Sequence, residues 1–167
     1  MRVTDPSPDV GKALRRLEGQ VCWNISAGGA AGSSFSMALG DRFPRKRELQ
    51  NPQASEEYRH FEGEYTLLVW CSWRLDGPDD SLVSSDQTAD TIASKLQIGL
   101  VGTRLLRTAV QSRAYDIRLD FEQELTLHVF CDRAPEDATS GDNWQLESPD
   151  GIVAVGPGFR GIVEPRV

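Results

Sequence analysis

The stretches CSWRLDGPDDS (residues 71–81) and GDNWQLESPDG (residues 141–151) share one pattern: Trp, any residue, Leu, an acid, a small residue, Pro and Asp. A chain of 167 residues therefore contains W-x-L-[DE]-[GS]-P-D twice. Self-similarity of this kind is the sequence signature of a repeated structural unit. The segments that precede the two copies should then match as well, in the same order.

An amphipathic helix pattern opens each half of the chain. In the first half Ser7 can act as the N-cap and Pro8 as the first helical residue. Apolar residues at helical spacing form the two stripes, which are Val10, Ala13, Leu14 and Leu17 in the first half and Ala89, Ile92, Ala93 and Leu96 in the second. Both patterns run into L-x-G, at 17–19 and 100–102, which predicts that each helix ends there.

Three strand patterns follow each helix, with apolar side chains at every second position. The expected matches are QVCWNIS (20–26) with TRLLRTAV (103–110), FSMAL (35–39) with YDIRL (115–119), and YTLLVWC (65–71) with LTLHVFC (125–131). Such alternation is typical of antiparallel sheets with one buried face. We therefore expect an α+β fold made of two duplicated helix–β-meander units related by pseudo-twofold symmetry, with the strands in one curved sheet or two facing sheets. The units span about 7–83 and 84–158, and a C-terminal tail follows at 159–167.

The two halves differ by insertions. The offset between matching residues falls from 80 at the second strand to 60 at the third, which marks residues 42–61 as added to the first half. The offset then rises to 71 at the Trp motif, which marks about 11 added residues in DRAPEDATSGDN (132–143). Function is often carried by loops inserted into a scaffold.

The insertions supply the residues that we expect to bind a partner. They combine charges with aromatic side chains, a composition that suits an interface with a polar rim and an aromatic anchor. The predicted binding residues are Arg45, Arg47, Tyr58, His60, Phe61, Asp137 and Asp142. The alternative is that 42–61 is a solvated loop ending in a short helix whose Tyr58 and Phe61 pack on their own domain.

Composition narrows the function classes. The formal net charge is −7, which argues against a general nucleic-acid binder because phosphate contacts need Lys and Arg. An acidic surface suits a basic protein partner, or it serves solubility alone. The sequence shows no signal peptide, and no apolar run approaches the ~20 residues of a membrane span, so we expect a cytoplasmic protein that binds no membrane. The excess of 15 Arg over 3 Lys is typical of a GC-rich bacterial genome.

Motifs that would indicate catalysis or a cofactor are weak. The Gly-rich stretch SAGGAAGSS (26–34) has no Lys and precedes a strand pattern, so a flexible connection fits better than a phosphate-binding loop. The three cysteines lack metal-ligand spacing and are expected to be reduced. We expect no catalytic residue, no metal and no cofactor.

Three further groups leave alternatives open. The acids Asp116, Asp120, Glu122 and Glu124 fit a solvated sheet face better than paired carboxylates for acid–base chemistry. A dyad of His128 with a cysteine is conceivable, but Cys71 and Cys131 share the face of the apolar stripe, where cysteine is usually inert. The outward-pointing Leu68, Trp70 and Phe130 form either a second apolar layer under the helices or an exposed binding surface.

The order of L-x-G, alternating strands, WQLESPDG (144–151) and VGPG (155–158) resembles small uncharacterised bacterial α+β domains, some of which are similar to immunity proteins of toxin systems. The resemblance implies a non-enzymatic protein-interaction domain, immunity- or antitoxin-like. The alternative is a small-molecule binding or catalytic domain with its site at the seam between the two halves.

Overall fold

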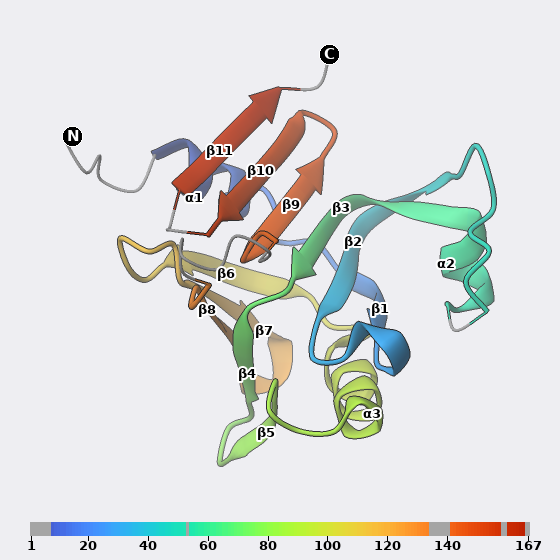
Figure 1. The fold of residues 1–167 in the computed structure, drawn as a ribbon, viewed down its shortest axis with the longest axis horizontal. Helices are drawn as coiled ribbons and strands as arrows, with labels where there is room; N and C mark the ends of the chain where they lie inside the picture. Colours follow the sequence, from blue (N-terminus) through green and yellow to red (C-terminus); the bar gives the residue numbers. More distant parts are fainter. Residues whose placement is uncertain (1–7, 53, 134–140, 158–159, 166–167) are drawn as a thin grey trace.

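The computed structural model describes residues 8–52, 54–133, 141–157 and 160–165, and these form an α+β fold of two antiparallel sheets with a few helices (Figure 1). The six-stranded sheet has the order β1-β2-β3-β9-β10-β11. The five-stranded sheet has the order β5-β4-β8-β7-β6. No helix among the described residues is long and apolar enough to cross a membrane.

The elements follow the predicted order along the chain. The strands of the six-stranded sheet are β1 (Cys22–Ala27), β2 (Phe35–Pro44), β3 (Phe61–Val69), β9 (Trp144–Ser148), β10 (Gly151–Gly156) and β11 (Arg160–Pro165). Those of the five-stranded sheet are β4 (Ser72–Asp76), β5 (Ser81–Ser84), β6 (Leu105–Val110), β7 (Ile117–Phe121) and β8 (Leu125–Phe130). The helices are α1 (Pro8–Arg15), α2 (Glu56–His60) and α3 (Ala89–Leu100), with single 3-10 turns η1 (Gly29–Ala31) and η2 (Glu122–Glu124).

The two sheets have the same strand order when the first is followed from β1 and the second from β6. The order β1-β2-β3-β9-β10 in one sheet corresponds to β6-β7-β8-β4-β5 in the other. The hairpin that carries each Trp motif therefore does not pair with the meander that precedes it. Hairpin β4–β5 of the first half completes the sheet of β6–β8, and hairpin β9–β10 of the second half completes the sheet of β1–β3.

Each of the two longer helices, α1 and α3, packs against a strand of the other half of the chain. Helix α1 packs against β6, and α3 packs against β1. Matched backbone hydrogen bonds join the halves at the helix ends: Gly19 N donates to Leu105 O at 2.7 Å, and Gly102 N donates to Cys22 O at 2.7 Å. Both glycines have positive φ, 88° and 90°, a conformation that residues with a side chain rarely adopt, so the L-x-G pattern has a backbone cause.

The core lies between the sheets and is one continuous cluster. Phe35 of the six-stranded sheet and Trp73 of the five-stranded sheet meet edge to face, with ring centroids 5.1 Å apart. The α1 and α3 leucines join the same cluster. Strand alternation correctly predicts the inward faces of β3 and β8, whose buried residues are Tyr65, Leu67, Val69, Leu125, Leu127 and Val129.

Three sequence expectations need correction. Strand β7 begins at Ile117 and not at Tyr115. Phe35 lies opposite Val69 in one sheet, and Ile117 lies opposite Val129 in the other, so Phe35 and Ile117 are the corresponding residues. The offset between the halves at the second strand is therefore 82 and not 80. The cause is Tyr115, whose φ of 65° ends any strand geometry before β7. The expected helix layer over Phe130 is absent among the described residues, and Phe130 is 38% exposed. Where the sequence predicts a tail at 159–167, the backbone forms β11, paired with β10.

One edge of the five-stranded sheet is capped by a side chain. Glu18, just after α1, accepts hydrogen bonds through Oε1 from the backbone N and the hydroxyl of Thr108, at 3.0 and 3.1 Å. Thr108 lies in β6, the edge strand. A backbone donor that would face solvent on an edge strand is therefore already occupied.

Candidate functional site

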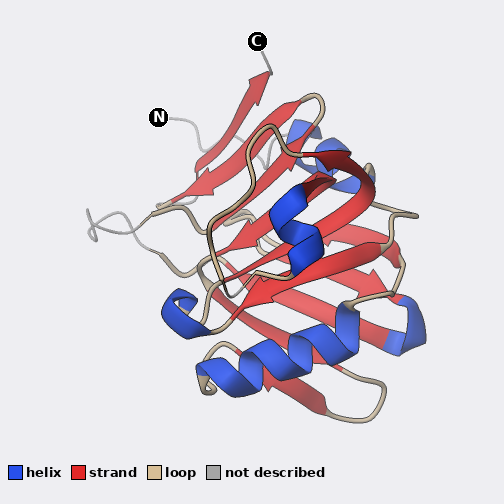
Figure 2. Cartoon of the chain, turned by 90° about the vertical axis from the view of Figure 1, so that its right-hand side faces the viewer, coloured by secondary structure: helices blue, strands red, loops and turns tan. Residues whose placement is uncertain are grey.

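The described residues of the first-half insertion, 42–52 and 54–61, form an arm that lies over the outer face of the six-stranded sheet. Strands β2 and β3 continue past the end of β1 into the arm, where Phe43 lies opposite Glu62. A register shift between Leu39 and Arg42, with Gly40 at φ 81°, marks where the arm begins. Figure 2 shows α2 of the arm in front of the sheets.

Aromatic and polar contacts hold the arm on the sheet. The rings of Trp23 in β1 and Tyr58 in α2 lie 6.1 Å apart, and the guanidinium of Arg42 lies 4.8 Å from the Trp23 ring centroid. Ser55 caps α2, and its hydroxyl also donates to the side-chain oxygen of Asn24 at 3.0 Å. Trp23 and Asn24 are buried as a result. The arm is therefore docked and is not a free loop.

The predicted binding residues of the arm divide into two groups. Arg45 and Tyr58 contact each other: the Arg45 guanidinium lies 4.6 Å from the Tyr58 ring centroid, and Arg45 Nε donates to Tyr58 O at 2.9 Å. Arg47, His60 and Phe61 are exposed. Tyr58 is therefore part of the contact that holds the arm on the sheet, whereas the side chain of Phe61 is exposed to solvent.

The two predicted acids of the second insertion are not part of the arm. Asp137 lies outside the described residues. Asp142 is half-buried, just before the buried Asn143 and β9. Asn143 is the residue that sequence reasoning missed: its side chain donates to Gly156 O and accepts from Arg133 N, both at 3.0 Å, so it organises this connection.

Between the arm and the sheet lies a hollow of about 460 Å³. Its lining comes from the arm, from β3 and from the β9–β10 turn, so both halves of the chain contribute to it. The lining residues are Phe43, Arg45, Leu49, Tyr58, Glu62, Gly63, Glu64, Thr66, Leu68, Glu147, Ser148 and Pro149. We call this space the arm hollow.

The arm hollow is acidic and has an exposed aromatic rim. Glu62, Glu64 and Glu147 face a single cation, Arg45, whose guanidinium lies 3.9 Å from the Glu62 carboxylate. Glu64 also accepts from Asp41 N at 3.2 Å, so it is partly committed to holding the arm. Phe43 is 46% exposed and borders the hollow.

A second hollow of about 520 Å³ lies on the same face, near η1 and the tip of the arm. Leu68 lines both hollows, and Trp70 lines the second. These two outward residues of β3, which the sequence assigned to a helix layer or a binding surface, therefore lie in the concave surface beside the arm.

Two buried donors near the arm lack an acceptor. Among the described residues, Trp23 Nε1 and Arg59 Nε are the buried side-chain polar atoms without a hydrogen-bond partner. Trp23 lies under the arm and Arg59 lies within α2. Unsatisfied buried donors are costly, so the docked position of the arm is less stable than its aromatic contacts alone would make it.

Other candidate groups are placed in ways that limit their chemistry. His128 lies on the outer face of β8, while Cys71 and Cys131 are buried on the inner face, so no dyad joins them. Asp116 accepts from Cys131 N at 2.6 Å, and Asp120 accepts from Arg118 Nε and the Thr126 hydroxyl, so these two acids are half-buried and hold the structure rather than lying on a fully solvated face. Within the described ranges no group of three His, Cys, Asp or Glu side chains is arranged to hold a metal ion.

Comparison of the chain with protein-family models, with curated proteins and with solved structures finds no match in any of the three.

Proposed function

We propose that this chain is a non-enzymatic protein-interaction domain that binds a basic segment of a partner protein at the arm. The observation that carries the proposal is an exposed phenylalanine, Phe43, at the rim of the acidic arm hollow. Phe61 of the arm is also exposed, but it lies opposite Pro44 and so points to the other face of the β2–β3 ribbon. Exposed aromatic side chains held on a fixed support are typical anchors of protein interfaces.

The chemistry of the arm hollow favours a basic partner. Glu62 and Glu147 face a space beside Phe43, and Arg45 is the cation there. A Lys or Arg side chain can lay its aliphatic part on the Phe43 ring and bring its charge to the carboxylates. A net charge of −7 adds long-range attraction for a basic partner. An immunity- or antitoxin-like role, implied by the sequence resemblance, belongs to this proposal.

We also propose that the two halves of the chain are copies of one duplicated unit. The matched strand orders and the matched hydrogen bonds of Gly19 and Gly102 are what two copies of one unit would give. The arm has no counterpart between β7 and β8, which are joined by the three residues of η2. A segment added to one copy of a scaffold that closes without it is where a specific function is expected.

A small-molecule site is the second candidate, favoured by one observation: the arm hollow is lined by both halves, through Leu68 on one side and Glu147 on the other. Its described lining holds carboxylates, hydroxyls and one guanidinium but neither histidine nor cysteine. This composition suits binding of an organic cation rather than nucleophilic catalysis.

Selection of a random peptide library on the immobilised full chain tests the proposal. We expect enrichment of peptides with Lys or Arg beside an apolar residue. The affinity of a selected peptide, measured by fluorescence anisotropy, should fall about tenfold in Phe43→Ala and in the double variant Glu62→Gln/Glu147→Gln, which corresponds to roughly 1.4 kcal/mol.

Leu82→Ala is the matched control, because Leu82 is also an exposed apolar residue but lies in β5 of the other sheet. Selected peptides without basic residues, or equal affinity for wild type and Phe43→Ala, would count against the proposal. Binding of small organic cations but of no peptide would favour the second candidate.

A further inference from the structure

The outer face of the five-stranded sheet carries two parallel rows of charge. The strand register places Arg74 of β4, His128 of β8 and Arg118 of β7 directly opposite one another. Two residues further along these strands, the register places Asp76 beside Thr126 and Thr126 beside Asp120. We call the first line the cationic row and the second the acidic row.

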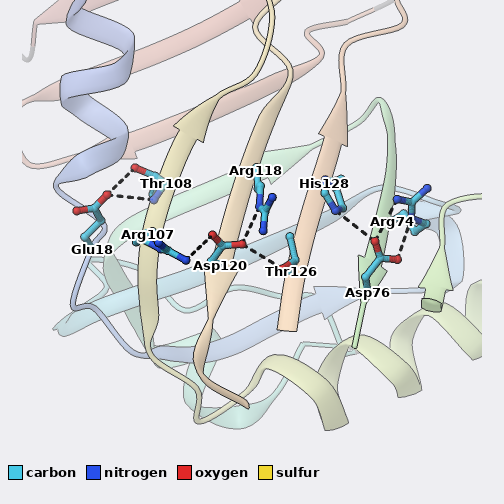
Figure 3. Close-up of polar contacts among 9 residues, drawn as sticks. All are labelled: Glu18, Arg74, Asp76, Arg107, Thr108, Arg118, Asp120, Thr126 and His128. Atoms are coloured by element: carbon cyan, nitrogen blue, oxygen red, sulfur yellow. Dashed lines mark hydrogen bonds and ion pairs between the residues drawn. The ribbon is translucent and has the colours of Figure 1, made fainter. Parts of the chain in front are cut away.

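Ion pairs link the two rows, as Figure 3 shows. Arg74 Nε lies 2.8 Å from Asp76, and His128 Nε2 lies 3.2 Å from the same carboxylate. Arg118 Nε lies 2.9 Å from Asp120. Arg74 and Arg118 flank His128, and each arginine is neutralised by a carboxylate of the acidic row.

This face is open in the described chain. The side chains of Arg74 and Arg118 are 45% and 44% exposed, and that of Arg107, which lies opposite Asp120, is 78% exposed. Helix α1 packs against β6 at one edge of the sheet and α3 against β5 at the other. The side chains of Arg74 and Arg118 are therefore exposed enough to make a second contact while they keep their ion pairs.

We propose that the outer face of the five-stranded sheet binds the same face of a second copy of this chain, to give a twofold symmetric dimer. The two rows lie two residues apart along the strands, or about 6.6 Å. A twofold axis that runs between the rows and parallel to them turns the cationic row of one copy onto the acidic row of the other. Arg74 then faces the second copy's Asp76, and Arg118 faces its Asp120.

A second copy fits this face because the pattern is complementary to itself. An isologous interface requires that each feature meet its complement after a twofold rotation, and two parallel rows of opposite charge meet that condition. Each carboxylate then gains a guanidinium from the other chain while keeping its own. The inference concerns a different sheet from the arm and stands independently of the proposed function.

One residue gives the arrangement a distinctive signature. Arg107 lies in line with the acidic row, so the rotation brings it near the second copy's Ala109 and Arg118. This contact is repulsive. Replacing Arg107 by Glu should therefore tighten the dimer, whereas charge loss at an arginine weakens most other associations.

Sedimentation equilibrium of the full chain tests the proposal. We expect a concentration-dependent dimer of twice 18.5 kDa that weakens as salt is added. Arg118→Glu and Asp120→Arg should each weaken association about tenfold, and the charge-swapped double variant Arg118→Asp/Asp120→Arg should restore it. Arg107→Glu should tighten it severalfold. Arg47→Glu, an exposed arginine of the arm, is the control and should leave association unchanged.

Circular dichroism checks that each variant is folded. If Asp120→Arg is not folded, the effect of Arg107→Glu on association decides the test. The proposal is overturned by a wild type that stays monomeric up to about 1 mM. It is also overturned by a folded double variant that fails to associate, or by a dimer that Arg118→Glu and Arg107→Glu affect in the same direction.

Discussion

Trp73 and Trp144 occupy corresponding positions in the two sheets. Trp73 lies opposite Val129, and Trp144 lies opposite Val69. Each indole N–H donates to the backbone carbonyl two residues before a core strand: Trp73 to Ser33 at 2.7 Å, and Trp144 to Tyr115 at 2.9 Å. The repeated Trp of the sequence motif thus fixes the start of β2 in one sheet and of β7 in the other.

Replacing either tryptophan by phenylalanine should destabilise the fold by a similar amount. Phenylalanine keeps an aromatic ring in the core but removes one hydrogen bond, either to the partly buried Ser33 carbonyl or to the Tyr115 carbonyl, which also accepts from Cys131 Sγ, and such a loss costs about 1 kcal/mol. Urea denaturation of Trp73→Phe and Trp144→Phe measures this cost. Trp70→Phe, at a half-buried position outside the core, is the control. A difference of several kcal/mol between the two core variants would show that the positions are not equivalent.

The exchange of hairpins predicts how the chain behaves when it is cut. A break between Gln87 and Thr88 falls just before α3, between the two halves. Each fragment lacks the hairpin that completes its sheet, so neither should fold as a monomer. The two fragments expressed together should form a 1:1 complex with the circular dichroism spectrum of the intact chain. A cooperatively folded monomer of residues 1–87 would contradict this prediction.

Shortening the arm should uncover Trp23 without unfolding the chain. Replacing residues 44–60 by a Gly/Ser turn removes Tyr58 and Ser55, which cover Trp23 and bond Asn24. We expect a stability loss of about 1–3 kcal/mol and a red shift of tryptophan fluorescence, since Trp23 becomes exposed. The variant Trp23→Phe with the same deletion should not show the shift. Loss of the cooperative melt would place the arm in the core of the fold.

The ion pair of Asp76 makes stability depend on acid. Hydrogen bonds from Arg74 hold the pKa of Asp76 below its ordinary value. Such a group stabilises the fold above its unfolded pKa and loses that contribution as pH falls through the folded pKa. The urea midpoint should therefore begin to fall near pH ~4 and continue to fall below it. In Arg74→Gln this acid loss should be smaller and should be complete at higher pH, whereas Arg47→Gln should follow wild type.

The cysteines should react slowly in the folded protein. Burial raises the pKa of Cys22 to about 12, and the pKa of Cys131 is also raised, first by its hydrogen bond with Cys71 and then by burial. Because the thiolate is the reactive form, a thiol reagent at pH ~8 should label the native chain slowly and the denatured chain at three sites. One labelled site after denaturation without reductant would instead indicate a disulfide between Cys71 and Cys131.

Periodicity was enough to predict α1, α3 and the inward faces of β3 and β8, because burial of one face imposes a period on each, but it did not predict β11 or the start of β7. The exchange of hairpins could not be predicted, since β4 and β9 carry the same W-x-L pattern and would bury the same residues in either sheet. The offset of 80 failed because the Tyr115 side chain is buried like a strand residue while its backbone is left-handed.

The candidate site was less visible in the sequence. The length of the insertion marked the arm, but its anchor needed Trp23, which lies far from it along the chain and gives no local signal. Phe43 was overlooked although it lies inside the same insertion. The charge rows could not be predicted, because Arg74, His128 and Arg118 come from three separate segments and meet only through the strand register.

The Glu18 cap on β6 has a consequence for how large an assembly this chain can form. Any strand that added to this edge would have to displace the carboxylate from the Thr108 amide and bury a charge without its donors. Growth of the sheet by edge addition is thereby penalised at β6, and open-ended fibrils are disfavoured there. In a twofold contact through the outer face of the five-stranded sheet, by contrast, each copy covers the binding face of the other. No such face remains free for a third copy, so the assembly stops at a dimer.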